Sequence, residues 1–494
     1  MKKTISLILI LAMAVCPLTS CGENPPPSSE TSTTPSVTED GTRIPLEVPD
    51  TRYDGEELVF LVRDGNDTWG TTEIYCPEIT EQTDNFSQAV YERNDRIYND
   101  YGVTIKEFRL GATMHPNKIQ QETMAPTGDF QAIVSDTSSL TTLGSSGYLV
   151  DLKSEYVEYL DFTKPWWDTK LAESMSINGH LYFATGDLLI DDNEATFAMM
   201  FNKDLAQDYR LEDMYSLVDS GNWTLDKFYQ MEQTAKNDAD GDGKIGYSSD
   251  IAGFAYTADT SFCLLFASGI TLCSKDAEDT PVYNLDVERA QDVTDIGKRV
   301  LGTDCALNLV TAETNGVPYW EAGDIAFSSN RALFYAQCMN TVAGLRNYEV
   351  NFGILPFPKY DTTQQNYYSL MHSGSSASFA IPRNISEDNL PMISAIVEAM
   401  AYHAVDTLTE QYYEINLKLK SAQDEKSSPM IDLILANRLY DLAYYYGWGN
   451  NAYSQLANGM SSSGSSVSSL NQRFKGMIRK NIEDLIDKIE DFED

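Results

Sequence analysis

Short apolar runs alternate with a long amphipathic segment in the first third of the chain, and this alternation restricts the fold more than any other feature. Leu58–Val62 predicts a buried strand, and Val103–Phe108 predicts a second one. Between them, residues 85–101 place apolar side chains on one helical face and stop at Gly102. Ala132–Val134 predicts a third strand. This order is typical of a parallel sheet covered by helices, so we expect an α/β protein.

The N-terminus carries an export signal. Lys2 and Lys3 precede an apolar run over 5–15 that is too short to span a bilayer, and Leu-Thr-Ser-Cys follows at 18–21. This pattern resembles the lipobox of bacterial lipoproteins, in which the signal peptide (here 1–20) is removed and the thiol of Cys21 receives acyl chains such as palmitate. Two or more acyl chains make a stable anchor. The alternative is an ordinary signal peptide that happens to precede a cysteine.

The segment after this cysteine is expected to be a tether. Residues 21–50 are rich in Pro, Ser, Thr and Glu and hold few apolar anchors, so they cannot offset the entropy lost on folding. We predict a disordered stalk that holds the protein at the outer face of a cell membrane. The length of the stalk favours a Gram-positive surface, and the sequence leaves a periplasmic location open.

The charge of the chain excludes some partners. Lys and Arg number 35 against 74 Asp and Glu, which gives a net charge of −39. Such a field repels phosphate backbones, so we expect no nucleic-acid partner, and it also disfavours membrane attachment through a basic patch. Neutral and cationic ligands remain. The seven cysteines contain no C-x-x-C pair and predict no disulfide framework.

A series of short motifs, in order along the chain, carries a resemblance to a known family. They are Gly147–Leu152 (GYLVDL), Pro165–Asp168 (PWWD), Asn178–Tyr182 (NGHLY), Phe201–Lys203 (FNK), Gly221–Asp226 (GNWTLD), Ala322–Phe327 (AGDIAF) and Phe352–Pro356 (FGILP). Together they resemble the extracellular solute-binding lipoproteins of ABC importers, in the group that takes sugars and oligosaccharides.

The resemblance implies a two-lobe fold of the periplasmic-binding-protein type II, with a ligand cleft between discontinuous lobes that close by hinge motion. By the resemblance, the chain crosses between the lobes at 195–202, near 323–327 and at 375–381. The expected lobes are 51–197 plus 326–375 for the N-terminal lobe and 198–325 plus 376–494 for the C-terminal lobe.

The resemblance also implies a function. We expect a monomer that captures a carbohydrate, most simply an oligosaccharide, in the interlobe cleft and delivers it to the permease subunits of an ABC transporter. The protein would then not be an enzyme. Which solute it binds is left open by the sequence.

Sugar sites pair aromatic platforms with carboxylates and amides that hydrogen-bond the hydroxyl rim. We expect Trp69 and Trp448 to be platforms, because each lies in a polar or Gly-flanked loop. Asp136, Glu194 and Asn330 follow predicted strands or lie at predicted crossings, and we expect them to contact ligand.

The remaining tryptophans are expected to pack. Trp166, Trp167 and Trp223 lie in a turn or just before a helix, where core or hinge packing is the simpler interpretation. Trp320 stands four residues before Asp324, and we expect it to pack a helix against its lobe.

One stretch resembles a calcium loop. Asp238, Asp240 and Asp242 occupy positions 1, 3 and 5, with Gly243 at position 6 and Lys244 at position 7. Alternate carboxylates converge on one hard cation in such a loop, so we predict a structural Ca²⁺. Position 12 is a serine instead of glutamate, and a neighbouring carboxylate would have to complete the shell. The alternative is an acidic surface turn.

Catalysis finds little support in the sequence. The four histidines are isolated, and the chain holds no zinc-protease motif, nucleophile elbow or phosphate loop. The enzyme alternative is a secreted, surface-anchored glycoside hydrolase, which needs only a pair of carboxylates. A surface adhesin or scaffold is a third class that the anchor and stalk permit.

Overall fold

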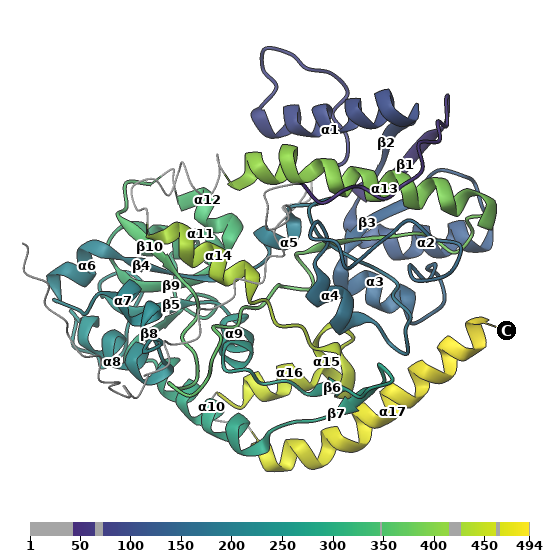
Figure 1. Cartoon of the computed structure of the whole chain (residues 1–494). Coiled ribbons are helices and arrows are strands. Elements are labelled where there is room, and N and C mark those ends of the chain that lie inside the picture. The colour runs from purple at the N-terminus through teal and green to yellow at the C-terminus, as the bar shows by residue number, and fades with distance from the viewer. Residues whose placement is uncertain (1–42, 65–72, 346–347, 414–425, 461–464, 494) are drawn as a thin grey trace, which may run out of the picture.

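The computed structural model describes residues 43–64, 73–345, 348–413, 426–460 and 465–493. Two sheets form the centres of two lobes that lie side by side (Figure 1). The predicted signal peptide, Cys21, most of the predicted tether and Trp69 lie outside the described residues. Within the described part, none of the helices combines the length and apolar character needed to cross a bilayer.

The first lobe is built on four strands in the order β11-β3-β1-β2. The strands are β1 (Glu57–Arg63), β2 (Thr104–Leu110), β3 (Ala132–Asp136) and β11 (Ala377–Ala380). β1 is parallel to both of its neighbours, and β11 runs antiparallel to β3 with Ala377 opposite Asp136. The three strands predicted in this part of the sequence are confirmed.

Helices cover the sheet of the first lobe, and α1 and α13 pack against each other. They are α1 (Asn85–Tyr101), η1 (Ala112–Met114), α2 (His115–Met124), α3 (Thr137–Gly144), α4 (Thr169–Met175), α5 (Asp191–Glu194), η2 (Glu387–Asn389) and α13 (Leu390–Ala404). The predicted helix over 85–101 is confirmed. The Asp84 carboxylate caps its start by accepting from the Ser87 amide at 2.9 Å, and Gly102 ends it with a left-handed φ of 75°.

The second lobe is built on five strands in the order β10-β4-β9-β5-β8. The strands are β4 (Phe197–Asn202), β5 (Ala252–Tyr256), β8 (Ala306–Asn308), β9 (Ala332–Cys338) and β10 (Phe352–Leu355). β5 is parallel to β8 and β9, whereas β4 is antiparallel to both of its neighbours. The helices are α6 (Lys203–Asp208), α7 (Met214–Asp219), α8 (Leu225–Ala235), α9 (Thr260–Ala267), α10 (Val287–Val300), α11 (Tyr319–Ser328), α12 (Met339–Leu345) and α14 (Ser427–Ala436).

Aromatic packing holds the core of the second lobe. The Phe228 ring lies 4.8 Å from Phe334 and 5.1 Å from Phe254, centroid to centroid. Trp223 packs on Phe334 and donates its indole N–H to the Pro356 carbonyl at 2.9 Å. Trp223 is fully buried, so its predicted packing role is confirmed.

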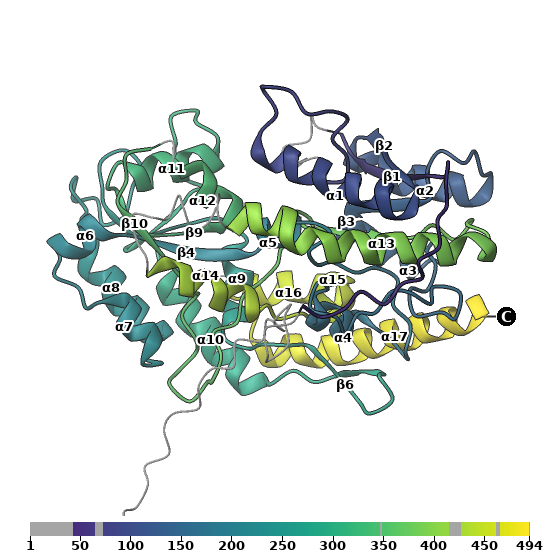
Figure 2. The ribbon, with the colours of Figure 1, turned by 45° about the horizontal axis from the view of Figure 1, so that its top comes forward.

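A third group of elements lies along one side of both lobes. It comprises β6 (Cys273–Lys275), β7 (Pro281–Tyr283), α15 (Leu442–Tyr445), α16 (Trp448–Asn458) and α17 (Val467–Glu493). The π-helical turn η3 (Val405–Thr409) is separate from this group: it follows α13 and packs against α1 in the first lobe. α17 begins against α10 and α16 and runs toward the first lobe (Figure 2). At its far end, Arg383 donates to the Phe492 carbonyl at 2.5 Å.

Backbone segments cross between the lobes side by side. The Phe197 amide donates to the Leu370 carbonyl at 2.9 Å, and the His372 amide donates to the Ala195 carbonyl at 3.0 Å. A further segment joins them, because the Ser369 amide donates to the Asn437 carbonyl at 3.0 Å. The crossing expected at 195–202 is therefore found at the start of β4.

The crossing expected near 323–327 is wrong, and so is the lobe assignment that depended on it. Residues 323–327 lie inside α11, which connects β8 to β9 within the sheet of the second lobe. β9 and β10 fall in the range expected for the first lobe, yet both pair with β4. β11 and α13 were expected in the second lobe, but β11 pairs with β3 and α13 packs on α1.

Candidate ligand-binding site

The parallel strands of the two sheets end at the junction between the lobes. In the first lobe, β1 ends at Arg63 and β3 ends at Asp136. In the second lobe, β5 is followed at once by Asp259 and α9. Ligands of open α/β sheets bind beyond the carboxyl ends of the strands, so this junction is the candidate site.

Arg63 organises the first-lobe side of the junction. Its guanidinium pairs with the Asp136 carboxylate at 3.2 Å and with the Asp191 carboxylate at the start of α5. It also lies 3.4 Å from the Ser375 carbonyl, on the segment that crosses back to β11. The Arg63 side chain is 6% exposed, so its charge is neutralised by carboxylates and not by water.

Glu194 lies next to this group at the end of α5. Burial, and after it the negative charge of Glu73, raise the pKa of Glu194 to about 7 against the lowering effect of Arg63. Glu73 itself is buried and accepts a hydrogen bond from the Ile190 amide at 2.7 Å. A carboxyl group with such a pKa can donate or accept a hydrogen bond near neutral pH, as a hydroxyl-bearing ligand requires.

His372 links the crossing segment to the second lobe. Its Nδ1 lies 2.9 Å from the Ser375 hydroxyl, and its Nε2 lies 3.9 Å from the Asp259 carboxylate. Burial lowers the pKa of His372, and Asp259 opposes the change. Together with Arg63, Asp136, Asp191 and Glu194, the residues His372, Ser375 and Asp259 form what we call the junction cluster.

A cavity of about 770 Å³ opens next to the junction cluster in the second lobe. Ala258 and Ser261, which flank Asp259, line it, as do Tyr256, Phe262 and Asn308 at the ends of β5 and β8. Ser454, Asn458 and Met460 of the α16 region line the opposite wall. This volume and this mixture of aromatic and small polar side chains suit a small organic ligand.

Two aromatic rings connect the cavity to the crossing segment. Phe262, which lines the cavity, packs edge-on against Tyr444 at 5.9 Å between ring centroids. Both side chains are half-buried. Burial raises the pKa of Tyr444, and its contact with Ser373 opposes that change. Tyr444 therefore remains a neutral donor and acceptor.

A second aromatic pair lies at the start of α11. Trp320 is 58% exposed and packs edge-on against Tyr319, which is 43% exposed, at 5.0 Å between ring centroids. α11 follows β8 and leads back to β9, and both strands run parallel to β5. The helix therefore begins at the edge of the sheet where β5 and β8 end, and it packs on the face of the sheet opposite to α8 and α9. The expectation that Trp320 packs a helix against its lobe is wrong.

The structure separates the residues predicted to contact ligand. Asp136 and Glu194 belong to the junction cluster. Asn330 does not: it follows α11 with a left-handed φ of 57° and accepts from the Asn202 amide at 2.6 Å. That contact lies where β4 ends and β9 begins, at the opposite end of the sheet from the cluster. The prediction for Asn330 depended on the wrong crossing.

Trp448 does not present a free face in this structure. It is 6% exposed at the start of α16 and packs at 5.3 Å against Tyr446. Trp69 lies outside the described residues. The sequence reasoning missed His372, Asp259 and Phe262, although Asp259 and Phe262 directly follow the strand-like run Ala252–Tyr256, which was a usable signal.

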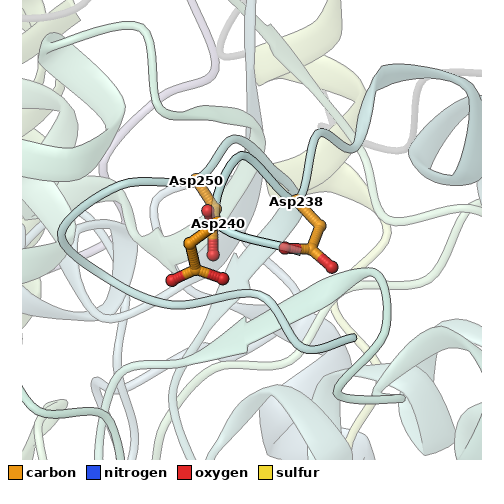
Figure 3. A group of neighbouring side chains, drawn as sticks. All are labelled: Asp238, Asp240 and Asp250. Carbon is orange, nitrogen blue, oxygen red and sulfur yellow. The ribbon is translucent and has the colours of Figure 1, made fainter. Parts of the chain in front are cut away.

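The predicted calcium loop lies away from the junction, between α8 and β5. Carboxylate oxygens of Asp238, Asp240 and Asp250 lie within 4.8 Å of one another (Figure 3). Asp250 thus takes the place of the missing carboxylate at position 12. Asp242 is not in this group; its carboxylate accepts from the Lys244 amide at 2.8 Å.

The chemistry of this group suits a hard cation. Asp250 is 2% exposed and accepts from the Gly246 and Ala239 amides at 2.7 and 3.0 Å. Burial alone would raise the pKa of Asp250, but these hydrogen bonds outweigh it and the pKa is lowered. The carboxylate is therefore ionised at neutral pH, as a metal ligand must be.

Comparison with known proteins gives matches of fold and not of sequence. No family model matches the chain, and a search of curated proteins finds no match. Among solved structures, an ABC substrate-binding protein from Listeria monocytogenes in complex with cycloalternan is similar with a TM-score of 0.53 at 12% identity; the match covers 87% of this chain and 100% of that one.

Two further structures show the same fold. The GacH receptor of Streptomyces glaucescens, studied with acarbose, gives a TM-score of 0.52 at 14% identity and covers 87% of this chain and 99% of its own. UgpB from Mycobacterium tuberculosis, in complex with glycerophosphocholine, gives a TM-score of 0.51 at 17% identity, and the match covers 81% of this chain and 96% of its own. The predicted fold class is confirmed: the chain has the two-lobe, type II fold of substrate-binding proteins of ABC transporters.

Proposed function

We propose that this protein is a lipid-anchored extracellular solute-binding protein that captures an oligosaccharide at the lobe junction and delivers it to an ABC permease. The observation that carries the proposal is the likeness, over 87% of this chain, to binding proteins whose structures hold cycloalternan and acarbose. A two-lobe fold with strand ends meeting at a junction suits capture by lobe closure.

The charges at the junction favour a neutral ligand over a phosphodiester such as glycerophosphocholine. Arg63 is paired with two carboxylates, and Lys298 at the edge of the cavity lies 2.8 Å from the Asp295 carboxylate. Glu194 and Asp259 add further carboxyl groups. These carboxylates would repel a phosphate, and the cations named here, Arg63 and Lys298, are already paired with carboxylates. Sugar hydroxyls, in contrast, hydrogen-bond to carboxylates directly.

A ligand panel tests this function. The purified protein is heated with linear malto-oligosaccharides, cyclic glucans and glycerophosphocholine, because a ligand that binds only the folded state raises the melting temperature. We expect a rise with one or more glucans and none with glycerophosphocholine. Chromatography of the incubated sugars separates a carrier from a glycoside hydrolase: a carrier leaves them intact.

The anchor and the permease partner rest on the sequence. Cys21 follows the lipobox-like Leu-Thr-Ser, and residues up to 50 supply a tether. A tethered binding protein stays within reach of a permease in the same membrane, which raises its effective concentration there.

The Asp238–Asp240–Asp250 group supports a second proposal, a structural Ca²⁺. These carboxylates, with the Lys244 position of the loop, would hold the ion, and binding would tie the end of α8 to the start of β5. Its distance in the fold from the junction cluster favours a stabilising role over a role in ligand binding.

A further inference from the structure

The β6–β7 hairpin reaches from the second lobe to the first. The hairpin leaves the second lobe after α9 and returns to it at α10. The Asn284 amide closes its base by donating to the Leu272 carbonyl at 2.9 Å, and the Tyr283 hydroxyl donates to Asn471 of α17 at 2.8 Å. Both views of the molecule place the hairpin beneath α4 of the first lobe (Figures 1 and 2).

The tip of the hairpin meets a turn of the first lobe. The Asp279 carboxylate accepts from the Ser176 hydroxyl at 2.7 Å and from the Gly179 amide at 3.0 Å. The Asn178 amide donates to the Asp279 carbonyl at 3.1 Å, and the Thr280 hydroxyl donates to the Asn178 side-chain oxygen at 2.9 Å. Side chains and backbone of both lobes thus share one hydrogen-bonded contact.

Lys275 strengthens this contact. Its ammonium group lies 2.7 Å from the Asp279 carboxylate within the hairpin and 3.0 Å from the Ser176 hydroxyl across the junction. It also donates to the Glu173 carbonyl at the end of α4 at 2.5 Å. Charge-assisted hydrogen bonds are stronger than neutral ones, and this group is only partly exposed.

Both sides of the contact are preformed by left-handed backbone. Asn178 and Gly179 have φ angles of 51° and 89°, and Asp279 has a φ of 64°. The hairpin tip is fixed by the Asp276 carboxylate, which accepts from the Thr280 and Glu278 amides at 2.9 and 3.1 Å. Two tight turns that are rigid before they meet lose little entropy on contact.

We propose that the β6–β7 tip is an interlobe clasp that holds the lobes in the orientation seen here and limits their separation in the unliganded protein. The crossing segments fix the lobes at their junction, while the clasp ties them through elements that are not crossing segments. Lobe movement away from this orientation has to break the bonds of Asp279 and Lys275. In the proposed binding function, the clasp would raise ligand affinity by favouring one lobe orientation.

Small-angle X-ray scattering of the unliganded full chain tests the clasp. Asp279→Gly removes the carboxylate without straining the left-handed backbone. We expect it to increase the radius of gyration and the maximum dimension relative to wild type. Glu278→Gly is the matched control, because Glu278 is the exposed neighbour in the same turn and makes none of the interlobe contacts above.

Thr280→Val is a second variant, which removes only the bond to Asn178, and we expect a smaller increase. Circular dichroism confirms that each variant is folded. The clasp is contradicted if folded Asp279→Gly and Thr280→Val scatter like wild type and Glu278→Gly. Since no ligand is needed, a failed ligand panel with altered scattering would overturn the binding function and leave the clasp standing.

Discussion

Trp166 donates its indole N–H to the Glu398 carboxylate at 2.8 Å, although the two residues stand 232 positions apart in the sequence. Trp167 donates to the other oxygen of the same carboxylate, also at 2.8 Å. This shared acceptor fastens the Pro-Trp-Trp-Asp turn to α13 and explains why two adjacent tryptophans can both be buried.

Removing the Trp166 ring should destabilise the first lobe. Trp166 is 1% exposed, so Trp166→Ala leaves a cavity and an unpartnered carboxylate oxygen, and we expect a loss of about 3–5 kcal/mol in the free energy of unfolding. Urea denaturation measures it. Trp320→Ala, which removes an equally large but exposed ring, should change stability by less than about 0.5 kcal/mol. Equal effects of the two substitutions would show that Trp166 is not a core residue.

Glu398 should make stability depend on pH. Burial raises its pKa to about 7 from an ordinary 4.5, against the lowering effect of the two indole donors. The contribution of Glu398 to the free energy of unfolding is therefore fully present below pH 4.5. It falls by about 3 kcal/mol as the pH rises from 4.5 through 7, because the unfolded chain then loses its proton more readily than the folded protein.

Urea titrations between pH 4.5 and 8 measure this decline, and Glu398→Gln should reduce it. Some decline should remain, because burial also raises the pKa of Asp187 and of Glu194 to about 7. Glu278→Gln, at an exposed site, should leave the profile unchanged. A Glu398→Gln profile that matches wild type would mean that Glu398 is ionised throughout this range.

Calcium removal should lower the melting temperature of the protein. Chelation withdraws a ligand that binds only the folded state. Asp240→Asn should abolish this sensitivity, because Asp240 is in the three-carboxylate group. Asp242→Asn should keep it, because the Asp242 carboxylate caps its own loop. Differential scanning calorimetry of calcium-loaded and chelated protein measures the melting temperatures. An equal loss of chelator sensitivity in both variants, or the absence of bound metal in calcium-loaded protein, would refute the site.

The lipid anchor depends on one thiol. Cys21→Ser should release the protein from the membrane fraction into the medium or the soluble fraction, because its acyl chains would be absent. Mass spectrometry of the wild-type N-terminal peptide should show acylated Cys21. Membrane retention of the variant together with an unmodified wild-type peptide would contradict the anchor.

Local patterns predicted the local structure. The apolar runs before Arg63 and Asp136 predicted β1 and β3, and the capped amphipathic segment predicted α1. Asp136 was chosen because it follows a recognisable strand, and the strand ends of an α/β sheet meet. Glu194 was chosen because it lies next to the crossing that the resemblance implies. The fold class followed from the resemblance, and comparison of structures confirmed it.

Long-range pairing was not visible in the sequence. Nothing near β9 indicates that it pairs with β4, over a hundred residues earlier, so the lobe boundary was placed before β9 and β10 instead of after them. His372 becomes part of the site only through its contact with Asp259, which is equally distant in sequence. Trp320 was misjudged because exposure depends on which side of α11 packs on the sheet, and the short helix carries apolar side chains on more than one face.

Titration calorimetry with an oligosaccharide from the panel tests the central claim, that a carbohydrate binds at the strand ends of the lobe junction. Wild type should bind saturably at one site and leave the sugar intact. Trp320→Ala should weaken binding ten- to hundredfold, which corresponds to about 1–3 kcal/mol for one aromatic anchor, while Tyr156→Ala, exposed elsewhere on the first lobe, should bind like wild type. Hydrolysis of the sugar, or no binding of any carbohydrate by folded protein, would contradict the account.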